Sequence, residues 1–430
     1  MHDLRPYRTY LWSLALGLLG AACSFDPSGG LGGSGTAIDG GPMIVPDGAP
    51  PPDGPIAVID GAPGTPDAGC QDLLPFTPSN FDPCQLAPLN APIVLDVKSG
   101  IFQIDTDAAT LDRPGSDPEP LSSIVIEQDG APPLLVIATS SFVIGPESAL
   151  GVVGTRVVAI VSTGDLTVLG GISAGAVGAG SGPGGDDADS CATGRGAGGE
   201  VQEIGVLEGG SGGGGGGFSA AGGDGAAVDG ADEPDLSPGG QAVGNEELVP
   251  LRGGCGGGSG GFAGGGPGGG AGGGLQLVAG GELRIDGIVT ARGGGGGSVA
   301  GSLSGGGGGG AGGGLLLEAS SIAIDGALTA NGGGGGEGSR TGVASDPGNN
   351  GPDDAAQRAP GGSGISNGGD GGPGGARDAE AGAIGLEGNS IVSALAGGGG
   401  GGGSTGRIHL RSIDGAPTFG PGAVVSPAPR

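Results

Sequence analysis

Residues 315–326 read LLLEASSIAIDG, in which two short apolar runs are joined by small residues and followed by an Asp-Gly turn. A similar pattern occurs as LQLVAGGELRIDG at 275–287 and as LVIATSSFVI at 135–144. Further copies are indicated by Val158, Ile160, Leu166, Val168 and the run 408–410. Short runs rich in Val, Ile and Leu, interrupted by Gly, Ser, Thr and Asp, are typical of β-strands. The recurring segment therefore predicts short strands that stack on one another.

Alternation within these segments predicts which side chains enter a core. The expected inward set is Leu275, Leu277, Leu283 and Ile285, and the expected outward set is Gln276, Val278 and Arg284. One short repeat cannot close its own apolar face, whereas stacked copies with parallel strands about 4.8 Å apart bury it. We therefore expect an all-β fold, a parallel β-helix or solenoid with long glycine-rich insertions.

Glycine makes the spacing of this repeat irregular. The segments at Leu275 and Leu315 are separated by GGGGGSVAGSLSGGGGGGAGGG, and similar tracts run through 178–274 and 332–406. Ordering glycine costs more backbone entropy than ordering any other residue. We expect flexible excursions from a solid β-helix on that ground. The alternative is that the tracts pack against each other as polyglycine-type strands, because glycine lets backbones approach closely.

Composition excludes several classes of function. The chain has 430 residues, 116 of them Gly and 34 Pro, and its formal net charge is −30. Such acidity argues against binding nucleic acid, which requires Lys and Arg to displace counterions from phosphates. Trp12, Tyr7 and Tyr10 lie near the N-terminus, and Lys98 is the only lysine. Few residues remain for general acid–base or nucleophilic catalysis, so we expect no enzyme, no cofactor and no metal.

The N-terminus carries an export signal. Arg5 and Arg8 precede the apolar run 11–19, which is too short to span a bilayer as a helix. The run ends LGAAC at Cys23 and resembles a bacterial lipobox, in which that cysteine is acylated and becomes the first residue. Ser24, rather than Asp, follows it, and by that resemblance we expect an outer-membrane, cell-surface location. An ordinary signal peptide or a signal anchor is the alternative.

Four cysteines remain after Cys23, namely Cys70, Cys84, Cys191 and Cys255. An oxidising compartment would pair them. Sequence order favours Cys70–Cys84 and Cys191–Cys255, although two other connectivities are allowed. Their spacings fit no zinc pattern.

Changes in amino-acid composition divide the chain into segments. We expect a signal peptide at 1–22, a lipid-anchored disordered tether rich in Pro, Gly and Asp at 23–69, and a small Cys-stapled cap at 70–90. The expected β-helix begins at 91–177, is interrupted by a glycine-rich insertion at 178–274, and continues through glycine-rich repeats to the C-terminus at 275–430.

Several segments of the chain together resemble those of a known protein family. The lipobox, the PDG-rich tether, FTPSNFDPC, GNEELVPLRGGCGGGSGG and the closing GGGGGGGSTGRIHL resemble glycine-rich surface lipoproteins of myxobacterial type, and more weakly the glycine-rich PGRS domains of mycobacteria. The resemblance implies a cell-surface location and an adhesive or matrix role. It supplies no catalytic residues.

Several short motifs could indicate a metal site or a catalytic residue. The calcium repeat G-G-x-G-x-D fails at 361–366, where Ser366 replaces Asp, and at 222–227, where Ala227 does. The acidic loops 186–189 and 353–354 are read as solvated charge rather than as calcium sites. Asp286 and Asp325 occupy equivalent Asp-Gly corners, which is good turn chemistry. His409 lies between two apolar residues and is expected to point outward from a strand.

We therefore expect a lipid-anchored, glycine-rich surface protein with a structural, adhesive or extracellular-matrix role. Its expected partners are the membrane, through the anchor, and extracellular polysaccharide or other cell-surface material. Two alternatives stay open. One is an exported carbohydrate-active β-helix enzyme, a lyase or glycosidase, which requires a groove with paired carboxylates. The other is a largely disordered, calcium-responsive matrix protein.

Overall fold

The structure is a computed structural model of the whole chain, which divides into two units, Met1–Gly61 and Ala62–Arg430. All residues described here belong to the second unit. They are 73–86, 91–95, 100–204, 207–228, 236–262, 264–298, 303–340, 343–364, 367–377, 379–388 and 395–430. Among them, helix is limited to the 3-10 turn η1 (Pro83–Gln85). No helix within these ranges has the length and apolar composition needed to cross a bilayer.

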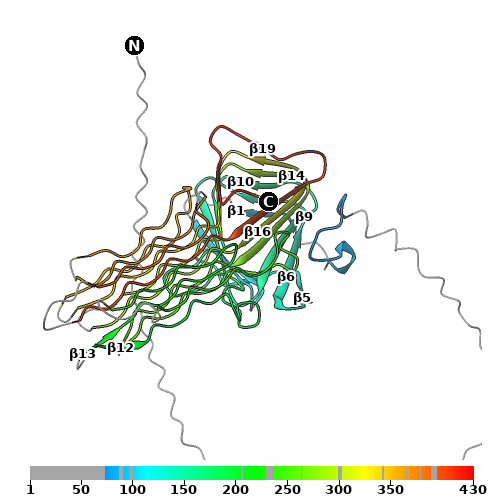
Figure 1. The fold of residues 1–430 in the computed structure, drawn as a ribbon. Coiled ribbons are helices and arrows are strands. Elements are labelled where there is room, and N and C mark those ends of the chain that lie inside the picture. The colour runs from blue at the N-terminus through cyan, green and yellow to red at the C-terminus, as the bar shows by residue number, and fades with distance from the viewer. Residues whose placement is uncertain are drawn as a thin grey trace, which may run out of the picture. The chain divides into compact units, whose positions relative to one another are not determined.

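Strands form two large sheets and one small one (Figure 1). The first sheet contains β1 (Ile93–Leu95), β5 (Ser123–Gln128), β6 (Ala131–Thr139), β7 (Phe142–Ile144), β9 (Val157–Ser162), β10 (Leu166–Val168), β14 (Gly274–Ile285), β16 (Gly314–Ile324), β18 (Arg407–Ser412) and β19 (Thr418–Phe419). The second contains β2 (Gly100–Asp105), β3 (Thr110–Asp112), β4 (Glu119–Pro120), β8 (Ser148–Val153), β11 (Gly171–Ser173), β15 (Ile288–Thr290), β17 (Ala327–Thr329) and β20 (Val424–Ser426). The small sheet pairs β12 (Val201–Ile204) with β13 (Leu207–Gly210).

The segments aligned by sequence lie side by side in the first sheet. Leu135 is opposite Val158, which is opposite Leu275, which is opposite Leu315, and Ile408 follows. Their side chains meet those of the second sheet in one apolar core, where almost every member is fully buried. Burying such side chains stabilises the fold by roughly 1.5–3 kcal/mol each.

The expected parallel β-helix is wrong, because both large sheets mix parallel and antiparallel pairing. In the first sheet β5 runs antiparallel to β6, and in the second β3 runs antiparallel to both β2 and β4. Hydrophobic alternation specifies which face of a strand is buried, but it does not specify the direction of the neighbouring strand. The described residues therefore form mixed sheets with almost no helix rather than a solenoid.

The outward assignment also needs correction. Gln276 and Val278 do point away from the main core, yet both are fully buried. A second apolar cluster covers that face of the first sheet, and it includes Leu74, Phe81 and Phe218. Residues far away in sequence supply this second layer, so local alternation could not reveal it.

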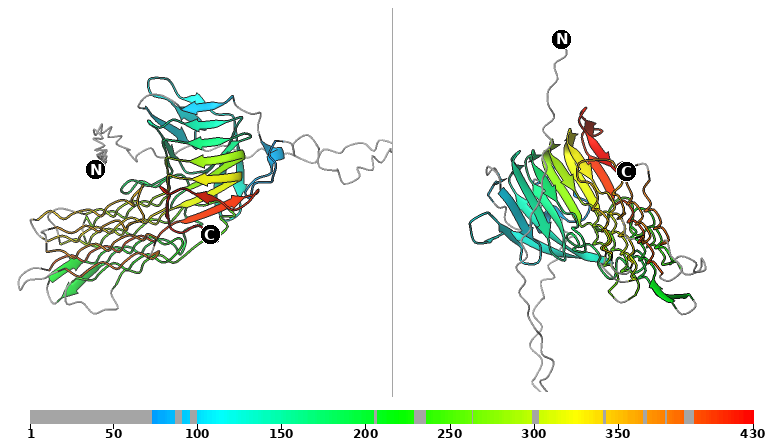
Figure 2. Two further views of the ribbon diagram at one scale, coloured as in Figure 1. Left: turned by 90° about the horizontal axis from the view of Figure 1, so that it is seen from above. Right: turned by 90° about the vertical axis from the view of Figure 1, so that its left-hand side faces the viewer.

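The glycine tracts form an ordered bundle of extended strands beside the sheets (Figures 1 and 2). Residues 305–310 lie in its interior, and successive N–H groups point to different neighbours. Gly308 N donates to Gly258 O (2.8 Å), Gly309 N to Gly401 O (2.8 Å) and Gly310 N to Gly294 O (2.9 Å). The direction repeats every third residue, as expected for a backbone with the three residues per turn of polyproline II.

Each interior strand is consequently surrounded on all sides. The tract 305–310 donates to three segments and accepts from three others. These neighbours are 258–261, 294–297, 398–401, 213–216, 266–269 and 333–336. A Cβ placed on Gly308 would lie 2.0 Å from Gly214 O, and one on Gly309 would lie 2.2 Å from Gly333 O. Only glycine fits where backbones approach this closely.

The expectation of flexible glycine excursions is therefore wrong, and the packed polyglycine-type alternative is what the structure shows. The entropy cost of ordering glycine is real, but the bundle satisfies its interior backbone donors in three directions. An unbonded buried N–H or C=O would cost about 1–3 kcal/mol, so the hydrogen-bonded arrangement offsets the lost freedom.

Candidate functional site

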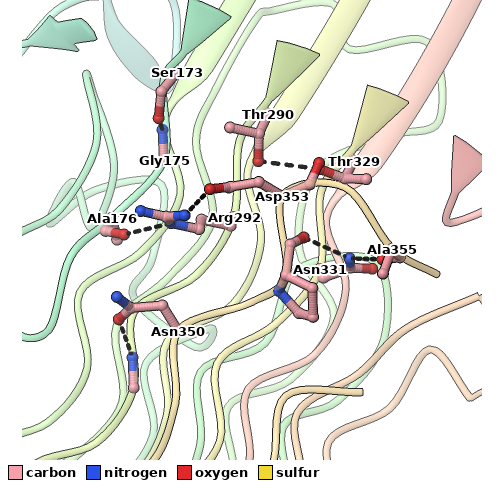
Figure 3. Close-up of polar contacts among 12 residues, drawn as sticks. Ser173, Gly175, Ala176, Thr290, Arg292, Thr329, Asn331, Asn350, Asp353 and Ala355 are labelled. Atoms are coloured by element: carbon pink, nitrogen blue, oxygen red, sulfur yellow. Dashed lines mark hydrogen bonds and ion pairs between the residues drawn. The ribbon is translucent and has the colours of Figure 1, made fainter. Parts of the chain in front are cut away.

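A row of hydroxyl side chains lies at the end of the second sheet that adjoins the glycine bundle. Ser173, Thr290, Thr329 and Ser426 occupy equivalent positions on β11, β15, β17 and β20. The Thr329 hydroxyl lies 3.1 Å from that of Thr290 and 2.8 Å from Asp353 O (Figure 3). The row places polar groups at the junction between sheet and bundle.

Asp353 and Arg292 form an ion pair at this junction (Figure 3). Arg292 follows β15 by two residues, and its Nε also donates to Ala176 O (3.3 Å). Burial raises the pKa of Asp353 above its ordinary value, while the Arg292 charge and a hydrogen bond from Thr290 oppose that rise. A half-buried carboxylate stays ionised more readily with such partners.

Two asparagines extend the junction into the bundle. Asn331 Nδ2 donates to Pro352 O and Ala355 O, both at 2.9 Å, and Asn331 Oδ1 accepts from Ser426 Oγ (2.6 Å). Asn350 Oδ1 accepts from the backbone N–H groups of Gly178 (3.0 Å) and Gly295 (2.9 Å). Side chains from 331–353 therefore connect the sheet end to two glycine strands. This cluster has a structural role, because its polar atoms bind backbone groups and one another and so hold the segments together.

A second polar cluster lies on the outer face of the first sheet. Glu318 on β16 is fully buried, and it accepts hydrogen bonds from Ser79 Oγ (2.7 Å), from Arg411 Nη1 (2.8 Å) and from Gln276. The Arg411 guanidinium also lies over the Phe76 ring, 5.7 Å from its centroid. The backbone N–H and the hydroxyl of Ser79 both donate to Glu318, so this cluster holds residues 73–86 onto the sheet.

The cysteines are placed as follows. Cys191 and Cys255 form a disulfide, and both are buried in the bundle region. Cys84 is also disulfide-bonded. Cys70 and the lipidation candidate Cys23 lie outside the described residues, and so does Ser366 of the rejected calcium motif.

Two acidic side chains of the loop 186–189 are bound by neighbouring protein groups. Asp186 Oδ1 pairs with Arg195 Nε (2.8 Å) and accepts from Gly256 N (2.9 Å). Asp187 Oδ1 accepts from Ser190 N and Ser190 Oγ, both at 2.9 Å. In the part of the chain that the structure describes, no three His, Cys, Asp or Glu side chains come together in a way that could hold a metal ion.

Of the remaining candidates, Asp286 and Asp325 directly follow β14 and β16, and His409 lies within β18. Asp286 pairs with Arg284 (2.9 Å), and Asp325 Oδ1 accepts from Gly422 N (2.9 Å), so both carboxylates support turns. His409 is half-buried on β18. The expected solvated charge at 353–354 is wrong for Asp353, which is committed to the junction described above.

Sequence reasoning missed Arg292 as the partner of Asp353, and it missed the contacts that Asn331 and Asn350 make with backbone groups. A signal was present, because Ser-Ala or Thr-Ala follows the third short strand of several repeats and Arg292 and Asn331 come directly after such pairs. Which loop these side chains would meet could not be read from the sequence.

No protein-family model matches the chain, no curated protein matches it, and no solved structure matches it.

Proposed function

We propose that the protein is a lipid-anchored structural protein of the outer membrane, displayed at the cell surface, with an adhesive or matrix role and without catalytic activity. The observation that carries this proposal is the ordered glycine bundle. Interior tracts such as 305–310 consist of backbone packed on backbone, and the polar clusters beside the bundle hold segments together. Such a construction suits a stiff element that presents a surface.

Two further features support an exported location. The buried Cys191–Cys255 disulfide is typical of proteins that fold in an oxidising compartment. The net charge of −30 keeps such a surface hydrated. Extracellular polysaccharide or other cell-surface material is the partner class that we propose.

The lipid anchor is tested by metabolic labelling with a palmitate analogue. We expect label on the wild-type chain and none on Cys23→Ala. Ser24→Asp is the matched variant: it keeps Cys23 and should keep the label, but by resemblance to other lipoproteins it should move the protein to the inner membrane. Label on Cys23→Ala would refute the anchor.

The surface role is tested on intact cells. Protease added outside should degrade the wild-type protein, and deleting the gene should reduce retention of cells on a polysaccharide-coated surface. An interior location, or unchanged retention, would contradict the proposal.

A further inference from the structure

The strand 379–388 lies at a corner of the glycine bundle. Gly382 N and Gly385 N donate to the carbonyls of 221 and 224, whereas Ala383 N and Leu386 N donate to those of 373 and 370. The carbonyls of 380, 383 and 386 accept from the segment 399–405. This strand therefore has three bonded neighbours, whereas the interior tract 305–310 has six.

The sequence of strand 379–388 agrees with its place at a corner of the bundle. Glycine recurs at 382, 385 and 388, and a Cβ on Gly385 would lie 2.0 Å from Gly399 O. The residues between these glycines carry side chains that point outward, including Ile384 and Leu386, which are 58% and 59% exposed. One face of the strand is thus buried against backbone, and the other presents two large apolar side chains to solvent.

Backbone N–H groups on the solvent-exposed side of this strand also recur every third residue. Ala381, Ile384 and Glu387 are all exposed, and their N–H groups make no hydrogen bond to any part of the chain that the structure describes. With a rise of about 3.1 Å per residue, such donors are spaced roughly 9 Å apart. A ligand in a β-conformation repeats every 6.4–6.8 Å or so and falls out of step, whereas another polyproline II strand stays in step.

We propose that strand 379–388 docks a further polyproline II strand supplied by a glycine- and proline-rich partner polypeptide. Carbonyls at every third residue of the partner would accept from the N–H groups of 381, 384 and 387. Proline suits the partner because it keeps its carbonyl and favours the polyproline II conformation, which lowers the entropy lost on binding.

The bundle already contains this type of contact. Ala383 N donates to Pro373 O (3.0 Å) on the covered side of the same strand, and Gly297 N donates to Pro267 O (2.7 Å) elsewhere. The docked strand would continue that packing on the open side. Arg358 donates to Ala381 O and Arg430 pairs with Glu380 on this strand, but Glu387 is exposed and the net charge of the chain is −30, so basic residues in the partner favour association.

The test uses a fluorescein-labelled peptide of five Gly-Pro-Lys triplets, with five Gly-Ala-Lys triplets as a peptide of equal charge, in fluorescence polarisation with the purified chain. We expect saturable binding of the proline peptide and weaker binding of the alanine peptide. Ile384→Pro removes the central N–H while keeping a compatible backbone, and it should weaken binding about fivefold. Ile384→Val, which keeps that N–H, should bind like the wild type.

Leu386→Ala provides an independent variant should Ile384→Pro perturb the bundle, because it removes exposed apolar contact area without changing the charge, and it should also weaken binding. Equal affinity for both peptides, no binding, or wild-type affinity of Leu386→Ala would overturn the proposal. Self-association that Ile384→Pro abolishes would assign the strand to a second copy and overturn it as well. The inference goes beyond the proposed surface role and requires no lipid anchor, so its failure leaves the Cys23 labelling result unaffected.

Discussion

The sheets and the glycine bundle reach order by opposite means. Between the sheets, Leu275, Leu277 and Leu315 are fully buried among other apolar side chains. In the bundle, Gly308 is equally buried, but its neighbours are backbone carbonyls. The first region is stabilised mainly by removing apolar surface from water. The second depends on backbone hydrogen bonds that run in three directions, with additional Cα–H···O contacts. Order in a protein interior therefore does not require side chains.

The number of glycines per triplet reports how many neighbours a bundle strand has. The interior tract 305–310 is glycine throughout. In 371–376 two of each three residues are glycine, with Pro373 and Ala376 at the third position, and in 382–388 only one of three is. Each side-chain position corresponds to a direction with no backbone pressed against it. This rule has no counterpart in the sheets, where alternation has a period of two.

The largest loss of stability is expected from a substitution that disrupts the apolar core between the sheets. Leu277→Asp places an unpaired carboxylate between the sheets, and the free energy of unfolding should fall by at least about 4 kcal/mol. Arg284→Gln, on the exposed side of the same strand, should change it by less than about 0.5 kcal/mol. Circular dichroism during urea unfolding measures both, and similar costs at the two positions would refute the inward assignment of Leu277.

Removing the disulfide should affect the bundle more than the sheets. Cys191 and Cys255 are 64 residues apart, and in the chain-entropy model the double substitution to Ser costs about 4 kcal/mol. Hydrogen exchange should show faster opening of the glycine segments while the sheet amides remain protected. Cys84→Ser leaves this disulfide intact, and uniform loss of protection in both regions would show that they unfold together.

Adding one methyl group tests the comparison most directly. Gly308→Ala forces a Cβ to within 2.0 Å of a backbone oxygen, and overpacking of this kind costs about 1–3 kcal/mol. Gly171→Ala on β11 is the matched control, because the nearest atom to its Cβ is Ile288 O at 4.0 Å. Thermal unfolding should show destabilisation only for Gly308→Ala, and equal tolerance would mean that the bundle is looser than described.

The smallest expected effect concerns pH at the junction between the regions. Because burial raises the pKa of Asp353, the folded protein binds that proton more readily than the unfolded chain does. The contribution of Asp353 to stability therefore increases as pH falls from neutral through its titration range, and is lost as pH rises. In melting temperatures at pH 7 and pH 5, Asp353→Asn should remove part of that trend. An unchanged trend would exclude Asp353 as its source.

Local patterns predicted much of the strand region and little of its surroundings. The alternation around Leu275 and Ile285 identified strands and their inward side chains, because period-two patterning is a local property. The burial of Gln276 and Val278 was missed, since residues 73–86 and the bundle cover them from far away in sequence. The strand directions were missed for the same reason, and so was the pairing of Arg292 with Asp353.

The sequence by itself determined which segments have apolar faces and which can meet only as bare backbone, since both properties belong to the residues themselves. The tertiary structure decided which glycine tract lies beside which, because tracts of identical residues offer identical hydrogen bonds and nothing in them selects a partner. That selection falls to sparse non-glycine anchors, such as the Cys191–Cys255 disulfide and the Asn350 amide. Their contacts exist only once the chain has folded.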